Sequence, residues 1–263
     1  MMKRTAALAA LLAAPLSVSE TAAAETRVSF ASGVDYSSGS YGDVMDTEVV
    51  SVPLAVRVTS GKWSFRASVP YLSITGPADV AEEDGGGTAP PGPIRVGTES
   101  GFGDTTLSAT RSFTRLGGSR AYFDVTGRVR LPSGDEERGL GVGTTDYALL
   151  GELGNSNEVG GVYVNGGRRF LGDRTGVERQ DGWQAGAGGW LRAGEQTRVG
   201  VFYSRRDASI EGNEAPQEAG AYVSYRFSDT LRVSINASGG LSEASPDIAG
   251  GFRLTWRPEA RDR

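Results

Sequence analysis

From Leu231 to Ser238 the chain reads Leu-Arg-Val-Ser-Ile-Asn-Ala-Ser, so apolar and polar side chains alternate at every step. Successive side chains of a β-strand point to opposite faces, and this stretch therefore predicts a strand with one apolar and one polar face. The segment just before it repeats the pattern, with Val223 and Tyr225 on one face and Ser224 and Arg226 on the other. No stretch of the chain after its first residues shows a convincing helical period. The sequence predicts an all-β protein.

Twelve alternating segments of this kind can be traced, and the connections between them are short and long in turn. Short turns on one side and long loops on the other are typical of a closed antiparallel transmembrane β-barrel of the bacterial outer membrane, with the short turns in the periplasm. An even number of strands places both chain ends on that same side. The predicted strands are residues 27–36, 46–58, 62–74, 104–114, 120–131, 145–154, 159–170, 182–192, 196–206, 218–227, 230–239 and 247–257.

The alternative fold is a water-soluble β-sandwich or a lipocalin-like barrel, in which the apolar faces would point inward. Two features favour lipid on the outside. The polar faces carry many large charged side chains, and five aromatic residues fall at strand ends, where membrane girdles lie: Trp63, Tyr147, Trp183, Phe227 and Trp256. Arg111 is an exception, because the alternation places it on the outward face. We expect it to reach toward the nearby periplasmic interface.

The composition excludes several classes of function. The 263 residues include no histidine and no cysteine, so the usual general base of barrel hydrolases and the usual transition-metal ligands are missing. We therefore expect neither an enzyme nor a bound cofactor. A net charge of −5 also argues against nucleic acid as a partner.

Residues 1–24 read as a signal peptide. Lys3 and Arg4 precede an Ala/Leu-rich stretch that runs from Thr5 to Leu16, and residues 22–24 are three alanines that fit signal-peptidase cleavage. The alternative, a transmembrane anchor, would need about 20 apolar residues. The mature barrel is then residues 25–263.

Two stretches resemble a known family. Ser100-Gly101-Phe102-Gly103-Asp104 opens the fourth predicted strand, and Leu131-Pro132-Ser133-Gly134-Asp135, Gly139-Leu140-Gly141-Val142-Gly143 and Asp146-Tyr147 connect the fifth to the sixth. These motifs are similar to those of outer-membrane proteins named for the meta pathway of phenol degradation, with Ser133 and Val142 in place of threonines. The resemblance implies an outer-membrane transporter-like barrel. Residues 251–256, Gly-Phe-Arg-Leu-Thr-Trp, resemble the signal read by the barrel-assembly machinery, although seven residues follow them.

Hairpin parity places charged side chains in the lumen. Near the extracellular mouth, Asp104 is expected within two residues of the position opposite Arg130, with Asp146 on the other side of Arg130. We interpret Asp104, Arg130 and Asp146 as a compensated cluster that either braces the loops or forms a polar eyelet that contacts solute.

At the periplasmic end the same parity pairs Arg192 with Arg198 and Arg226 with Arg232, all four pointing inward. Like charges directly opposite each other are unfavourable. This basic cluster therefore predicts either counter-charges, such as Glu152, or a pore that favours anions. Arg57 and Arg253 also face the lumen.

The longest connection runs from Gly76 to Ser100. Its acidic residues lack the ordered spacing of a calcium loop, so we interpret it as a solvated surface loop. The predicted function is passage of small solutes through a charged barrel lumen, with outer-membrane lipid, the barrel-assembly machinery and a small solute as partners. The alternative is a structural or surface-binding barrel with a plugged lumen.

Overall fold

The computed structural model describes residues 26–42, 45–76, 97–174 and 178–259. The predicted signal peptide and the acidic part of the longest loop lie outside these residues. The strands are β1 (Thr26–Gly39), β2 (Thr47–Ser60), β3 (Trp63–Thr75), β4 (Thr98–Phe102), β5 (Thr105–Thr114), β6 (Ala121–Leu131), β7 (Asp146–Ser156), β8 (Gly160–Phe170), β9 (Gly182–Arg192), β10 (Thr197–Arg206), β11 (Gln217–Arg226), β12 (Leu231–Gly240) and β13 (Ile248–Trp256).

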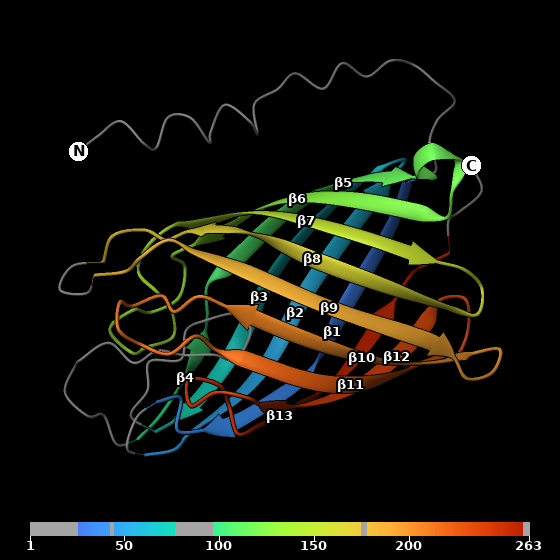
Figure 1. Cartoon of the computed structure of the whole chain (residues 1–263). Helices are drawn as coiled ribbons and strands as arrows, with labels where there is room; N and C mark the ends of the chain where they lie inside the picture. The colour runs from blue at the N-terminus through green and yellow to red at the C-terminus, as the bar shows by residue number, and fades with distance from the viewer. Residues whose placement is uncertain (1–25, 43–44, 77–96, 175–177, 260–263) are drawn as a thin grey trace.

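The strands form one closed antiparallel barrel (Figure 1). Neighbours in the chain pair with each other, and β1 closes the ring by pairing with both β2 and β13. The short strand β4 and the strand β5 pair with successive parts of β3, so they form one barrel strand that is interrupted at Gly103 and Asp104. The barrel therefore has twelve strands, as predicted. The predicted boundaries agree to within three residues, except that the fourth strand already begins at Thr98.

The apolar faces of the strands point outward. Val164, Val201 and Ile235 are 55%, 62% and 58% exposed, although each lies in the middle of a strand. Buried apolar side chains gather instead at one end of the barrel, in a cluster of Tyr41, Val49, Leu72, Ile74 and Leu140. A soluble sandwich would bury its strand faces, so the alternative of a water-soluble β-fold is wrong. The outer wall is the apolar surface that a lipid bilayer requires.

The two ends of the barrel differ, as Figure 1 shows. One end, which we name the short-turn rim, carries the turns at 61–62, 115–120, 157–159, 193–196 and 227–230. The other end, the long-loop rim, carries the connections at 132–145, 171–181, 207–216 and 241–247. Strands β1 and β13 begin and end, respectively, at the short-turn rim. This arrangement confirms the predicted alternation of short and long connections.

Aromatic side chains ring the outer wall near both rims. Phe30 stacks with Trp256 at a ring distance of 5.7 Å near the short-turn rim, and Tyr71 meets Phe102 edge-on at 5.4 Å toward the long-loop rim. The five predicted girdle residues all lie at or next to strand ends. Among the described residues the only helix is the 3-10 turn Leu116–Gly118, and no helix is long and apolar enough to span a membrane.

Candidate functional site

The polar faces of the strands enclose a lumen. A cavity of about 550 Å³ lies in the half of the lumen toward the long-loop rim. It is lined by six arginines, including Arg66, Arg128 and Arg253, and by three carboxylates, Asp35, Asp104 and Glu218. Arg253 forms an ion pair with Asp35 at 3.2 Å. Arg57 stands directly opposite Arg66 in the β2–β3 ladder. The predicted inward direction of Arg57 and Arg253 agrees with this register.

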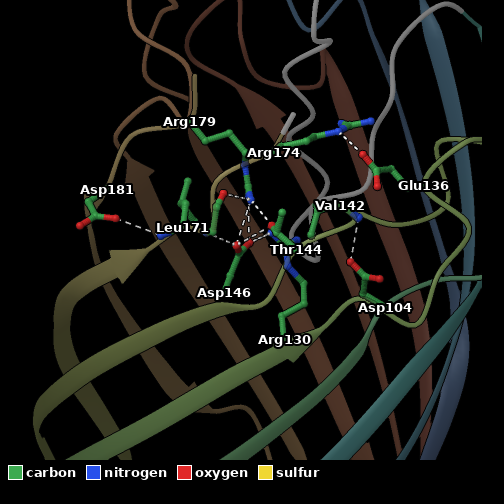
Figure 2. A network of polar contacts seen from close by, with 11 residues as sticks. Asp104, Arg130, Glu136, Val142, Thr144, Asp146, Leu171, Arg174, Arg179 and Asp181 are labelled. Atoms are coloured by element: carbon green, nitrogen blue, oxygen red, sulfur yellow. Dashed lines mark hydrogen bonds and ion pairs between the residues drawn. The ribbon is translucent and has the colours of Figure 1, made fainter. Parts of the chain in front are cut away.

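Asp146 is the centre of a buried polar network at the long-loop rim (Figure 2). Its carboxylate is 7% exposed and forms an ion pair with Arg130, its direct partner in the β6–β7 ladder. Arg179, from the loop at 171–181, donates to both carboxylate oxygens of Asp146 at 2.9 Å. The backbone N–H of Gly172 donates to the same carboxylate at 2.9 Å, and Thr144 donates at 3.3 Å. Asp146 therefore ties β6 to β7 and to the next long loop.

Asp104 performs a related task on the neighbouring loop. Its two carboxylate oxygens accept hydrogen bonds from the backbone N–H groups of Gly134 and Val142, each at 2.9 Å. Figure 2 shows the contact with Val142. The ladder partner of Arg130 is Thr106, two residues from Asp104 and within the predicted tolerance. The structure thus places Asp104, Arg130 and Asp146 at one rim and joins Arg130 to Asp146. The carboxylate of Asp104 is turned toward the loop.

The loop at 132–145 is held tightly against the strands. A Cβ atom on Gly134 would collide with the carbonyl oxygen of Leu140, and one on Gly141 would lie 2.6 Å from an oxygen of Asp104. Ser133 accepts a hydrogen bond from the N–H of Thr105 at 2.8 Å. The two motifs that resemble the transporter family therefore meet in space. Their glycines let the loop backbone approach the carboxylate of Asp104 closely.

Leu140, at the tip of this loop, is 1% exposed. It belongs to the same buried cluster as Val49, Leu72 and Ile74, three side chains on the inner face of β2 and β3. The loop consequently packs into the long-loop mouth and narrows the lumen there.

The basic cluster lies at the opposite end, at the short-turn rim. Arg192 stands directly opposite Arg198, and Arg226 directly opposite Arg232, as predicted. All four line one cavity of about 690 Å³, together with Arg120 and only two carboxylates, those of Glu158 and Glu195.

Three of the four arginines contact backbone or ring atoms, and Arg226 does so through the carbonyl oxygen of Glu195 at 3.5 Å. Arg192 donates to the carbonyl oxygens of Gly194 and Glu195 at 3.1 and 3.0 Å, and the guanidinium of Arg198 lies 4.4 Å from the ring centre of Trp190. Within residues 26–42, 45–76, 97–174 and 178–259, no ion pair joins any of the four to a carboxylate. Their positive charge therefore faces the cavity.

Glu152, the expected counter-charge, is engaged elsewhere. It lies opposite Asp124 in the β6–β7 ladder, and it accepts a hydrogen bond from the hydroxyl of Tyr122 at 2.8 Å. Of the two alternatives, a counter-charge from Glu152 is therefore not seen, because no ion pair joins Glu152 to the basic cluster among the described residues. Parity alone predicts that Glu152 faces the lumen. It does not predict which strands face each other across the lumen, and so it cannot give the partners of Glu152.

One continuous cross-strand row joins the two predicted clusters. It begins at Arg226 and Arg232, and it ends at Arg130 and Asp146. Between them every inward residue is small. The members in order are Arg226, Arg232, Thr255, Ala31, Ala55, Ser68, Thr106, Arg130 and Asp146. Because strands are tilted in a barrel, such a row climbs along the wall from one rim to the other. The two clusters are thus joined along the inner wall by a row of small side chains.

The described residues contain no group of three or more carboxylate, histidine or cysteine side chains able to hold a metal ion. The chemistry of the lumen is that of arginine: a fixed positive charge and planar donors suited to carboxylate and phosphate.

Comparison with known proteins supports the fold. No protein-family model matches the chain, and no curated protein matches it significantly in sequence. Among solved structures, an outer membrane channel from Pseudomonas putida F1 is similar with a TM-score of 0.63 and 15% identity, over 93% of this chain and 99% of that one. The KdgM porin is similar with a TM-score of 0.56 and 7% identity, over 88% and 99%. The chain has the closed twelve-stranded barrel of outer-membrane channels.

Proposed function

We propose that this protein is an outer-membrane channel that passes small solutes through its lumen and favours anions. The carrying observation is the basic cluster: four arginines face one cavity at the short-turn rim without a carboxylate ion pair among the described residues. Low-dielectric walls focus the field of such charges along a pore and raise the local concentration of anions. The channel fold of its structural neighbours supports this reading.

In this proposal the short-turn rim faces the periplasm, and the long-loop rim faces the outside, as in other outer-membrane barrels. The barrel-assembly machinery would insert the chain from the periplasmic side. The resemblance of the two loop motifs to the meta-pathway family fits such a transporter-like barrel, but those motifs build the mouth of the barrel, and they carry no information about the solute.

The test is the ion selectivity of the purified protein in a planar bilayer under a salt gradient. We expect the wild-type reversal potential to indicate anion preference. Arg226→Gln with Arg232→Gln should reduce this preference, and Arg226→Glu with Arg232→Glu should shift selectivity toward cations. Arg115→Glu is a matched control, because Arg115 is exposed in the turn between β5 and β6 at the same rim. A reversal potential that does not respond to the Glu substitutions would refute the basic pore.

A second candidate is a barrel whose lumen is plugged and whose loops bind a partner. The burial of Leu140 inside the long-loop mouth favours it. Conductance of the unmodified protein separates the two. Single-channel steps support passage of solute, whereas their absence, together with no solute-driven swelling of vesicles, supports the plugged barrel.

A further inference from the structure

Arg111 and Arg168 point away from the lumen, toward the surrounding lipid. Arg111 on β5 alternates with inward-facing residues, as do Leu107 and Phe113 on the same strand, and Arg168 on β8 shares the outer face with Val164. Arg111 lies near the short-turn rim, as the sequence predicted, and Arg168 near the long-loop rim. An arginine on the lipid-facing wall is costly unless its charge reaches the interface. Both therefore need a reason to be there.

The two arginines have the same surroundings. Arg111 stands directly opposite Trp63 in the β3–β5 ladder, and its guanidinium lies 5.0 Å from that ring and 5.8 Å from the ring of Phe113. Arg168 stands directly opposite Trp183 in the β8–β9 ladder.

The guanidinium of Arg168 lies 5.4 Å from the ring of Trp183 and 5.8 Å from the ring of Phe170. At each rim the pattern is an arginine, a phenylalanine two residues later and a tryptophan across the ladder. Different strands produce the same arrangement at opposite ends of the barrel.

Aromatic rings contact a guanidinium through their faces and leave its N–H edges available as donors. Within the part of the chain that the structure describes, Arg111 forms no ion pair and no hydrogen bond through its side chain. Arg168 approaches Asp181 only at 3.8 Å, with both side chains more than a third exposed, a contact of little strength. Both guanidiniums can therefore accept a further anion.

Membrane girdles of tryptophan lie at the level of the lipid headgroups. The anion available at that depth is the headgroup phosphate, and the planar guanidinium fork matches its oxygens. We infer that Arg111 with Trp63 and Phe113, and Arg168 with Trp183 and Phe170, are two binding sites for lipid phosphate, one at each rim. Held at both interfaces, the barrel is fixed in depth and tilt within the bilayer.

Native mass spectrometry of the folded protein in a non-ionic detergent tests this inference. The probes are dioleoyl phosphatidylglycerol and dioleoylglycerol, which has the same chains and no phosphate. The wild type should retain two molecules of the phospholipid and no diacylglycerol. Arg111→Gln and Arg168→Gln should each weaken one of these two sites about tenfold, the usual effect of losing one charge-assisted hydrogen bond. The double variant should lose both molecules.

Arg205→Gln is the matched control, because Arg205 is an exposed arginine near the long-loop rim that pairs with Asp207 at 3.2 Å. It should retain both lipids. Arg111→Lys keeps the charge without the planar fork and should bind the phospholipid with intermediate strength. The inference is overturned if the double variant retains phospholipid like the wild type, or if dioleoylglycerol is retained equally well. Complete displacement of the lipid by inorganic phosphate at matched concentration would assign the sites to the free ion and would equally overturn it.

Discussion

Replacing Asp146 by Asn tests how the long-loop mouth is held together. The substitution keeps the size of the side chain and removes its charge. Arg130 and Arg179, whose side chains are 11% and 6% exposed, then lose the carboxylate that they share. Leaving buried charges without their partner typically costs about 3–5 kcal/mol, and we expect the free energy of unfolding to fall by about that amount. Urea unfolding in lipid vesicles, followed by tryptophan fluorescence, measures it.

Two further variants separate charge from hydrogen bonding. Asp104→Asn should cost less, about 1–3 kcal/mol, because the partners of Asp104 are backbone N–H groups and not buried cations. Adding Arg179→Met to Asp146→Asn should recover part of the loss, since the second change removes a buried charge that has no counter-ion. A loss below about 1 kcal/mol in Asp146→Asn, or no recovery in the double variant, would refute a network held by charge.

Two other predictions concern the same mouth. Burial raises the pKa of Tyr41 to about 12, and its hydroxyl donates to Ser37 at 2.7 Å. The folded state therefore holds this proton more tightly than the unfolded chain. The contribution of Tyr41 to stability should be constant below pH ~10 and should be lost as the pH rises from ~10 to ~12. Tyr41→Phe should reduce that alkaline slope in urea titrations, and an unchanged slope would contradict the assignment. Gly134→Ala should destabilise the barrel by about 1–3 kcal/mol, because its Cβ would meet the backbone of Leu140. Gly127→Ala, which meets nothing within 4 Å, should leave the unfolding midpoint unchanged, and equal effects of the two substitutions would argue against a tightly packed loop.

The barrel could be predicted from the sequence because a strand period of two leaves little freedom. Once Leu231–Ser238 is assigned as a strand, the direction of every side chain in it follows. A tight hairpin then fixes register, which is why Arg226 and Arg232 stand opposite each other as predicted. The same reasoning placed Arg111 on the outer wall. What the arginines do for solutes stays a prediction.

The long-loop mouth could not be predicted in the same way. Arg179 and Leu140 lie in connections without periodicity, so no pattern indicated that one would bind Asp146 and the other would fill the mouth. The strand interruption at Gly103 and Asp104 could not be predicted either, because it depends on contacts with residues distant in the sequence. The N–H of Gly103 donates to Pro70 at 2.8 Å while the side chain of Asp104 serves the adjacent loop. Only the glycine-rich motifs hinted that backbones approach closely there.

The distribution of charge is more informative about this protein than its total. The whole chain carries 32 acidic and 27 basic side chains, which on its own suggests an acidic protein. The two lumen cavities show the reverse, with six arginines against three carboxylates in one and five against two in the other. Alternation along the strands is what turns most of these arginines inward, where low-dielectric walls concentrate their field. The positive charge of the lumen is therefore set by strand register. A one-residue slip in a single hairpin would move the arginines of that hairpin from the lumen into lipid.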